Sequence, residues 1–584
     1  MKRGMMVLLL LWLALPLSVF SQEKTEQEYK EVFEAAYKAC PDIPQGLLEA
    51  ISFTNTQCHH LTDDNYFHDD AYAMPRSYGL MGLVKNGKGC FRENLHLVAD
   101  LSGFPESEIL ESPATNVLAY AKAFNCLAIE AKADEIKGWL EVVRQLSELP
   151  TGEEKDAYPM QSMLYSVCLF LNDAEKAERY GFEQFHIDMP AVFSDYLDML
   201  TAPELSLTRE SDYPSAIWSP APECNWGTRS KQVSAVVIHY TEGTYAGCIS
   251  WFKNCDAHVS AHYVIRSADG QVTQMVREED MAWHARTANG YSIGIEHEAY
   301  GNIWSFFTEE MYQSSANLVR DICSRYASIN GHRTFYRDTL DNGTCLNNGL
   351  HDLGGEEACT KIRGHQHYPD QSHTDPGPYW DWNYYYKLIN EGTPTLVLEG
   401  EEGSLNHQNY GNDERMIWVI RTPEGSKAQL EFSSFKLEAD YDFLWIYDGD
   451  NVYAPKIGRW NRHSPGLVRA SGNVMCVEFR SDCGVPAAGW EAKWSSFGNI
   501  PVEPEEDETE ESVFPNPTNG KFTIYSKNGG FTDVAVYDVY GRTMVKARFV
   551  DSIEIDASDW ASGVYIVNYG MPVALGNVVK LVKL

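Results

Sequence analysis

The sequence predicts a chain of several domains: a helical N-terminal domain, an α/β domain with a central mixed sheet, and two all-β domains. The length of 584 residues is enough for roughly three to five domains. Apolar residues recur at helical spacing in 22–205, whereas short strand-like runs interleave with helices in 223–392. Apolar and polar residues then alternate in 393–497, which is typical of a β-sandwich, and a smaller β unit follows in 513–584.

The N-terminus has the pattern of a secretory leader. Met-Lys-Arg is followed by the apolar run Val7–Phe20 and then by Ser21-Gln22. A basic start, a short apolar core and a small residue before a polar stretch predict a cleaved signal peptide over 1–21. A membrane anchor is the alternative, but the run is short for a span. No later stretch is apolar enough to cross a bilayer, so we expect no transmembrane segment.

Composition excludes two classes of partner. The formal net charge is −36, which argues against nucleic acid and against anionic lipid, because both require basic surfaces. The 13 cysteines fit an oxidising compartment, and the odd count leaves at least one thiol unpaired. Cys168, within an apolar run, is the expected free core cysteine.

The first large region, 22–205, is predicted to be mostly helical. Apolar residues at helical spacing place helices at 25–39, 43–53, 116–131 and 134–147. Residues 206–222 are rich in Ser, Pro and Ala, and we interpret them as a linker.

The α/β region follows. Short β-branched runs predict strands at 234–240, 261–265, 272–276 and 292–298, and helices are expected at 309–329 and 380–389. Between the helices lies a long insertion, 330–361, in which Cys345 and Cys359 could form a disulfide that holds the loop.

A loop dense in proline, glycine and histidine closes this region. Residues 364–378 read Gly-His-Gln-His-Tyr-Pro-Asp-Gln-Ser-His-Thr-Asp-Pro-Gly-Pro, a composition that breaks helices and strands. His365, His373 and Asp375 on such a loop can offer ligands to zinc, but a catalytic site needs a ligand from elsewhere in the chain. His239, at the end of strand 234–240, is the candidate, although a lone strand-end histidine is more commonly a hydrogen-bonded core residue.

The last part of the chain is predicted to be all-β. Strands at 395–398, 416–420, 429–432, 443–447 and 474–479 indicate a sandwich. Residues 498–512 form an acidic linker, which separates the sandwich from the smaller β unit.

Six motifs in order give the α/β region a family resemblance. They are Val-Ile-His-Tyr-Thr (237–241), Val-Ser-Ala-His-Tyr-Val-Ile (259–265), Ala-Trp-His-Ala (282–285), Ile-Gly-Ile-Glu (293–296), Gly-His (364–365) and Thr-Asp-Pro-Gly-Pro (374–378). Residues 223–392 therefore resemble the type-2 N-acetylmuramoyl-L-alanine amidases, which are similar to peptidoglycan recognition proteins. The resemblance implies zinc ligands at His239, His365 and Asp375 and a catalytic glutamate at Glu296.

The resemblance also implies a reaction. Zinc-bound water would attack the amide between N-acetylmuramic acid and L-alanine of peptidoglycan, with Glu296 as general base and then acid. The alternative for Glu296 is a strand carboxylate that faces solvent. His373 stands where the family often has a lysine that stabilises the oxyanion, so we expect the rate to fall above neutrality as His373 loses its proton.

Further family positions carry weaker expectations. Trp283, His284 and His262 match positions that line the substrate cleft, although they could equally be core residues. Cys248 and Cys255 stand where the recognition proteins have a short disulfide.

The sandwich resembles a CUB domain. Its signature is matched by 435–449 (Phe-Lys-Leu-Glu-Ala-Asp-Tyr-Asp-Phe-Leu-Trp-Ile-Tyr-Asp-Gly), by Phe-Arg-Ser-Asp at 479–482 and by Gly-Trp at 489–490. Calcium-binding members use carboxylates that match Glu438, Asp442 and Asp482, and clustered oxygen ligands suit calcium. An acidic face without metal is the alternative. Cys476 and Cys483 could pair.

The terminal β unit resembles the C-terminal sorting domain of the type IX secretion system of Bacteroidetes. The matching stretches are Val-Phe-Pro-Asn-Pro-Thr-Asn-Gly (513–520), Val-Tyr-Asp-Val-Tyr-Gly-Arg (536–542) and Ser-Gly-Val-Tyr-Ile-Val (562–567). The resemblance implies export through the periplasm, by the type IX secretion machinery, to the outer-membrane surface or the medium.

The helical region is similar to the lysozyme-like lytic transglycosylases. Ala50–Thr56 matches the family's first helix motif, but Asn55 stands at the position of its acid glutamate. Asparagine cannot protonate a leaving sugar oxygen, so we expect a degenerate domain that could still bind glycan. An unrelated helical cap is the alternative.

Taken together, the sequence predicts a secreted zinc amidase that acts on peptidoglycan or muropeptides. Two other functions stay open. One is a peptidoglycan-binding module without catalysis, although all three candidate zinc ligands are present. The other is a bifunctional enzyme whose helical domain also cleaves glycan.

Overall fold

The computed structural model describes residues 26–66, 73–150, 157–201, 211–301, 303–337, 339–340, 344–498, 513–525, 532–538, 543–550, 552–570 and 577–584. The predicted signal peptide 1–21 lies outside these residues, as does the acidic linker beyond residue 498. No helix within the described residues is long and apolar enough to span a bilayer.

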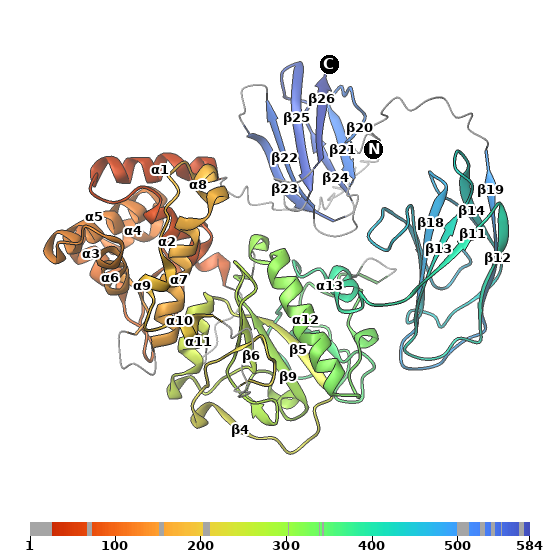
Figure 1. Ribbon diagram of the computed structural model, residues 1–584, viewed down its shortest axis with the longest axis horizontal. Helices are drawn as coiled ribbons and strands as arrows, with labels where there is room; N and C mark the ends of the chain where they lie inside the picture. Colours follow the sequence, from red (N-terminus) through yellow and green to blue (C-terminus); the bar gives the residue numbers. More distant parts are fainter. Residues whose placement is uncertain are drawn as a thin grey trace, which may run out of the picture.

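Helices make up the N-terminal domain, as predicted (Figure 1). They are α1 (Glu26–Ala39), α2 (Leu47–Thr56), α3 (Asn94–Ser102), α4 (Glu106–Glu111), α5 (Pro113–Ala131), α6 (Ile136–Leu146), α7 (Ala157–Asn172), α8 (Ala174–Tyr180), α9 (Met189–Val192) and α10 (Leu197–Leu200). A short hairpin of β1 (Ser77–Tyr78) and β2 (Leu83–Val84) lies between α2 and α3.

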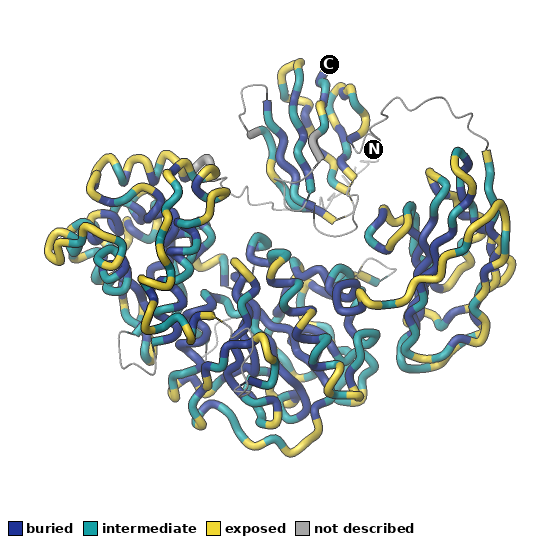
Figure 2. Tube along the Cα trace, in the orientation of Figure 1, coloured by how far each residue is buried: buried dark blue, intermediate teal, exposed yellow. Residues whose placement is uncertain are grey.

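A six-stranded mixed sheet with the order β10-β5-β9-β6-β7-β3 forms the centre of the α/β domain. Its strands are β3 (Ile217–Trp218), β5 (Ala235–Tyr240), β6 (Tyr263–Ile265), β7 (Val272–Gln274), β9 (Ser292–His297) and β10 (Ile362–Gly364). All pairs are parallel except β6 with β7. The strands are buried because helices cover the sheet, as the dark segments of Figure 2 show.

Three helices pack on this sheet: α11 (Tyr245–Phe252), α12 (Glu309–Arg325) and α13 (Trp382–Ile389). Helix α12 was predicted to reach residue 329 but ends at Arg325, where Tyr326 takes an extended conformation. Residues 206–210 of the predicted linker 206–222 lie outside the described residues, and the rest is more than a linker. Its apolar Ile217 and Trp218 form β3, which adds to the edge of the sheet beside β7.

The helical domain and the α/β domain share one hydrophobic core. Apolar residues of α2, α5 and α7 belong to the same buried cluster as those of α11. Polar contacts cross the same boundary. The Tyr158 hydroxyl lies 2.8 Å from Thr273 Oγ1, and Arg266 Nη1 donates to Ser162 Oγ at 3.0 Å. These buried contacts join the two domains through one continuous core.

Two sheets face each other in the β-sandwich, as predicted. One sheet has the order β11-β13-β18-β15-β16 and the other β12-β19-β14-β17. The strands are β11 (Thr395–Glu399), β12 (Glu402–Gln408), β13 (Arg415–Arg421), β14 (Lys427–Lys436), β15 (Phe443–Tyr447), β16 (Lys456–Trp460), β17 (Leu467–Arg469), β18 (Val474–Arg480) and β19 (Gly489–Phe497).

The C-terminal unit is a smaller two-sheet domain, drawn in blue in Figure 1. Its strands are β20 (Val513–Phe514), β21 (Lys521–Tyr525), β22 (Thr532–Asp538), β23 (Thr543–Phe549), β24 (Ser552–Asp556), β25 (Gly563–Gly570) and β26 (Asn577–Lys583). Arg548 lies 4.0 Å from the ring centroid of Trp304, so this domain touches the α/β domain.

Charged contacts and a disulfide join the sandwich to the α/β domain. Arg333 Nη2 lies 2.8 Å from Asp413 Oδ2, and Cys359 of the insertion is bonded to Cys483 of the sandwich. Cys359 was predicted to pair with Cys345, and Cys483 with Cys476. Both pairings are wrong, because Cys476 points into an apolar cluster of the sandwich while Cys483 follows the end of β18 and faces the insertion.

The third predicted disulfide, between Cys248 and Cys255, is also wrong. Cys255 begins a short 3₁₀ helix that packs beside the 3₁₀ helix carrying Cys224, and these two cysteines are bonded. Cys248 lies on α11 and is buried in the core as a free thiol. Cys168 is free and buried, as predicted, and burial raises the pKa of its thiol to about 12.

Candidate active site

The carboxyl ends of three parallel strands meet at one point. In the register of β5 and β9, His239 lies opposite Glu296, so both side chains project from the same side of the sheet. Strand β10 pairs with β5 on its other edge and ends at Gly364, directly before His365. Parallel strands place their carboxyl ends at one edge, which is where α/β folds carry their sites.

His239, His365 and Asp375 converge there. His239 Nδ1 lies 2.7 Å from Asp375 Oδ2, and His365 Nδ1 lies 3.2 Å from Asp375 Oδ1. One ligand atom from each residue falls within 4.8 Å of the other two, and all three side chains are buried. The three residues that the sequence predicted as zinc ligands therefore form one cluster.

Hydrogen bonds determine which nitrogen of His365 faces the cluster. Gln371 donates its amide to the Ala285 and Pro369 carbonyls, at 3.2 and 3.0 Å, so its Oε1 is left to accept. His365 Nε2 lies 2.6 Å from that oxygen and must carry the proton. The Nδ1 lone pair of His365 therefore points to the centre of the cluster.

A chain of hydrogen bonds also determines which nitrogen of His239 faces the cluster. Ser292 Oγ donates to the Ala288 carbonyl at 2.7 Å, so it accepts from His284 Nε2, which lies 3.3 Å away. His284 Nδ1 is then an acceptor for His239 Nε2 at 3.0 Å. This leaves the lone pair of His239 Nδ1 directed at Asp375. His284, predicted to bind substrate, is thus also the side chain that orients His239.

The charge distribution of the cluster suits a cation. Burial raises the pKa of Asp375, but His365 and His239 together hold it well below its ordinary value. Burial raises the pKa of Glu296 well above its ordinary value, and Asp375 and Glu242 add to this. Within the described part of the chain, Asp375 Oδ1 and Glu296 Oε2 are buried without a hydrogen-bond partner. Two neutral imidazoles and one carboxylate, with unsatisfied oxygens beside them, are a donor set that fits zinc.

A cleft of about 430 Å³ opens over this cluster. The predicted residues Trp283, His284, Glu296 and His373 line it, and the His373 ring stacks on His365 with centroids 5.1 Å apart. Glu296 therefore faces the cleft and not bulk solvent. Four further lining residues, Tyr66, Ala73, Met74 and Arg76, come from the helical domain, and no motif in the sequence marks them.

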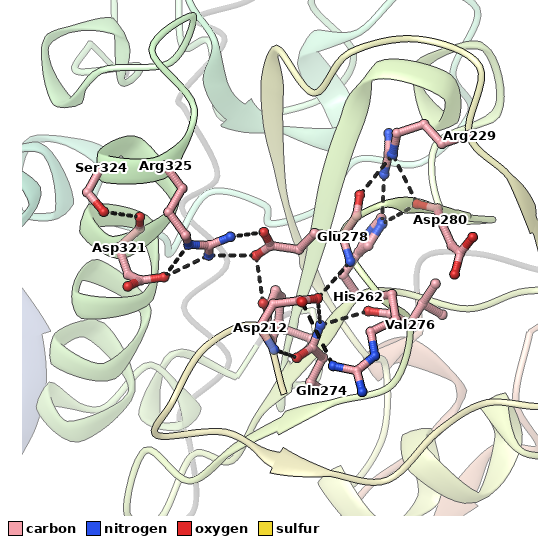
Figure 3. A network of polar contacts seen from close by, with 12 residues as sticks. Asp212, Arg229, His262, Gln274, Val276, Glu278, Asp280, Asp321, Ser324 and Arg325 are labelled. Carbon is pink, nitrogen blue, oxygen red and sulfur yellow. Dashed lines mark hydrogen bonds and ion pairs between the residues drawn. The ribbon is translucent and has the colours of Figure 1, made fainter. Parts of the chain in front are cut away.

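His262, in contrast, does not reach the cleft. It is fully buried, and its two ring nitrogens lie 3.0 Å from the Gly294 amide and 2.8 Å from Arg229 Nη2. Figure 3 shows His262 beside Arg229 within a polar network that continues through Glu278 to Arg325. The prediction that His262 contacts substrate is wrong, since it lies among the packed groups beneath the site.

A second cluster lies on the sandwich. Glu438, Asp442 and Asp482 place carboxylate oxygens within 4.8 Å of one another, as the sequence suggested. Burial raises the pKa of Glu438 to about 7 and of Asp442 to about 6, and neighbouring carboxylates add to both shifts. Glu438 Oε2 has no hydrogen-bond partner among the described residues.

In the helical domain, Asn55 serves packing. Its Nδ2 donates to the Met81 carbonyl at 3.0 Å, and Ser52 and Thr56 donate to the Leu80 carbonyl, each at 2.8 Å. These bonds hold the turn after β1 against α2. Asn55 therefore stands at the predicted acid position, but its side chain is hydrogen-bonded to the backbone of the turn.

Two histidines, an aspartate and a half-buried glutamate at the carboxyl ends of parallel strands define a zinc-hydrolase type of site. Residues 229–378 match the family model of N-acetylmuramoyl-L-alanine amidase. N-acetylmuramoyl-L-alanine amidase A of Achromobacter lyticus is 41% identical over 182 residues, which cover 31% of this chain and 97% of that protein. The chain belongs to this zinc-dependent amidase family, and its enzymatic activity is that of an N-acetylmuramoyl-L-alanine amidase.

The other domains have matches of their own. Residues 396–494 match the CUB domain and residues 512–574 match the secretion system C-terminal sorting domain, so the protein is secreted or displayed at the cell surface. Mouse procollagen C-endopeptidase enhancer 2 is 33% identical over 109 residues, which are 17% of this chain and 26% of that protein. Among solved structures, the PlyG catalytic domain is 14% identical with a TM-score of 0.21, covering 30% of this chain and 93% of that one.

Proposed function

We propose that His239, His365 and Asp375 hold the zinc ion of this amidase and that Glu296 transfers the protons of the reaction. The convergence of the three ligand atoms, with the lone pairs of both histidines directed inward, is the observation that carries the proposal. A bound zinc ion would supply a Lewis acid that activates water and polarises the scissile carbonyl. The substrate is the amide between N-acetylmuramic acid and L-alanine in peptidoglycan or its fragments.

The side chains around the ligands have distinct roles in this proposal. Glu296, half-buried at the side of the cleft, takes a proton from the attacking water and delivers it to the departing amine of L-alanine. His373, stacked on His365, lies where it can donate a hydrogen bond to the carbonyl oxygen as negative charge develops. Trp283 offers an aromatic face to the sugar or the peptide.

Glu296→Gln tests the assignment of the proton carrier. The amide keeps the shape of the side chain but cannot accept the proton, so we expect a loss of about 10²–10⁴ in kcat. Zinc content, measured on the same preparation, should equal that of the wild type because Glu296 is not a ligand. His239→Ala is the matched variant that should lose both zinc and activity. Wild-type kcat in Glu296→Gln would overturn the assignment.

We propose a calcium ion at Glu438, Asp442 and Asp482. Burial and neighbouring carboxylates raise the pKa values of Glu438 and Asp442, and Glu438 Oε2 has no hydrogen-bond partner among the described residues, so a bound cation would offset crowded negative charge. Oxygen-only ligands of this kind suit calcium. Calcium at 100 times its Kd should stabilise the wild type by about 2.7 kcal/mol and leave Asp442→Asn unchanged. Equal thermal shifts for both proteins would contradict the site.

We propose that the protein first enters the periplasm and then crosses the outer membrane. The predicted signal peptide over 1–21 and the sorting domain support this route. Removing 513–584 should leave the protein, with an active amidase domain, in the periplasmic fraction. Export at the wild-type level would contradict the route.

We propose that the helical domain does not cleave glycan through its lysozyme-like motif. The bond from Asn55 to the Met81 carbonyl supports this, because that side chain has no proton to give to a leaving sugar. Digests of purified cell wall should contain no new reducing ends or anhydro sugars. Such products, persisting in Glu296→Gln, would establish a bifunctional enzyme instead.

A further inference from the structure

The cleft of the amidase is built by two domains. Tyr66, Met74 and Arg76, which follow α2 in the helical domain, line the same cleft as the zinc-ligand cluster and Glu296. The family match covers only 229–378, so these three residues lie outside the amidase domain proper. The helical domain therefore contributes surface that a substrate must touch.

Tyr66, Met74 and Arg76 form one wall of the cleft, and close packing holds this wall in place. The Tyr66 hydroxyl donates to the Ser77 carbonyl at 2.7 Å and accepts from the Ser77 amide at 2.8 Å. The Tyr66 ring meets Tyr300 of the α/β domain edge-on, with centroids 5.9 Å apart.

Met74 reaches the turn that follows β5. A Cβ atom at Gly243 would lie 2.3 Å from Met74 Cε, so Met74 can approach this closely only because glycine has no side chain. Gly243 is four residues from His239. The wall is thus packed directly against the strand that carries a zinc ligand, and the shared core of the two domains prevents it from swinging away.

The wall places a positive charge in an acidic cleft. The carboxyl groups of Glu242, Glu296 and Asp375 line the cleft, and its guanidinium groups are those of Arg76 and Arg286. Arg286 donates to the Asp370 carbonyl and to Ser372 Oγ, at 3.2 and 2.9 Å, and so holds the loop that carries the ligands.

Arg76 contacts residues of the helical domain. Its guanidinium lies 5.1 Å from the ring centroid of Tyr66, and its ion pair with Asp63 spans 3.3 Å. The side chain of Asp63 is 72% exposed, and an ion pair with such a partner contributes little to stability. An anionic ligand in the cleft can compete with Asp63 for Arg76, and a planar guanidinium is suited to bind a carboxylate through two hydrogen bonds.

We propose that the helical domain forms the substrate-selecting wall of the amidase cleft, with Arg76 as the residue that binds a carboxylate of the substrate's peptide. This rests on the proposed function. The lactyl carboxyl of N-acetylmuramic acid is consumed in the scissile amide, so an intact substrate carries its carboxylates on the peptide side. Tyr66 and Met74 provide apolar surface for the peptide on either side of that contact.

The test compares two soluble muropeptides that differ at one stem residue, which carries either a free carboxylate or a carboxamide. Arg76→Ala should raise KM for the carboxylate form by about 10–100-fold, the effect of losing a charge-assisted hydrogen bond, with kcat within about twofold. Hydrolysis of the carboxamide form should be unchanged. Arg76→Lys should fall between, because lysine keeps the charge but not the paired geometry.

Two further variants act as controls. Arg179→Ala removes a guanidinium from α8 that stacks on Tyr180 away from the cleft, and it should leave both KM values unchanged. Asp63→Asn removes the negative charge that competes for Arg76 and should lower KM for the carboxylate form.

The outcomes separate the two proposals. Suppose that the wild type hydrolyses both muropeptides. If Arg76→Ala then has wild-type KM values for both, or KM values raised equally for both, the role of Arg76 is overturned while the zinc site stands. If the zinc-loaded wild type hydrolyses neither, the proposed function itself fails. Zinc content should be the same in all Arg76, Asp63 and Arg179 variants, since none of these residues touches a ligand.

Discussion

Gly294 offers the sharpest probe of the zinc site, although it touches no ligand. An ideal Cβ atom at Gly294 would lie 2.5 Å from Cγ, 2.6 Å from Nδ1 and 2.8 Å from Cδ2 of His284. Unbonded carbon atoms prefer about 3.5–4.0 Å, so the imidazole would have to withdraw by about 1 Å. His284 Nδ1 is the acceptor for His239 Nε2 at 3.0 Å, and that hydrogen bond would be lost or distorted.

The expected magnitude follows from the role of that bond. Losing the outer partner of a metal-binding histidine typically costs about 10–100-fold in metal affinity. Gly294→Ala should therefore raise the zinc Kd by that factor, equivalent to about 1.4–2.7 kcal/mol. The value of kcat/KM in excess zinc should also fall, by up to about 100-fold, because a displacement of about 1 Å disturbs the reacting geometry.

Competition with a chromogenic chelator measures the zinc Kd, and Gly290→Ala is the matched control. Gly290 lies four residues earlier, and its Cβ would meet only Lys231 Cδ at 3.8 Å, an ordinary contact. The double variant Gly294→Ala/His284→Ala should bind zinc no more weakly than His284→Ala alone, because the clashing ring is gone. Wild-type affinity in Gly294→Ala, or additive losses in the double variant, would refute the reasoning.

Three other predictions concern stability and substrate binding. Burial raises the pKa of Glu49 to about 7, so the folded protein keeps a proton that the unfolded chain releases near pH 4.5. The free energy of unfolding therefore falls as the pH rises from about 4.5 to about 7. Glu49→Gln should remove that slope and, by pH 8, be more stable than the wild type by about 3 kcal/mol in urea titrations, whereas parallel curves would contradict the raised pKa of Glu49. Cys359→Ser removes a cross-link between residues 124 positions apart and should cost about 2–5 kcal/mol in the unfolding of the sandwich, read by calorimetry, with amidase activity retained. Trp283→Ala should raise KM with unchanged zinc content, and an unchanged KM would place Trp283 outside the substrate path.

Sequence patterns were sufficient for the parts of the site that are local. His239 ends a β-branched run, and His365 and Asp375 lie on one proline-rich loop, so strand and loop signals mark all three. They converge because β5, β9 and β10 are parallel and pair in a fixed register, which local patterns do not reveal. The prediction that they form one site came from the family motifs.

Features that depend on three-dimensional packing could not be read from the sequence. Cys255 pairs with Cys224 because two 3₁₀ helices pack together, and no cysteine spacing encodes that contact. His262 and His284 look alike in their motifs, yet His262 is packed against Arg229 away from the cleft, whereas His284 orients His239. Arg76 reaches the cleft only because two domains share a core, which no single-domain pattern reports.

The most direct test of the zinc amidase account is the release of new L-alanine amino termini from purified peptidoglycan, measured together with bound zinc. Wild-type protein with one zinc per active site should release these termini, and chelation should abolish the release. Glu296→Gln should bind zinc equally and release them at least about 100-fold more slowly. Release that survives removal of zinc, or products that contain only new sugar ends, would contradict the account.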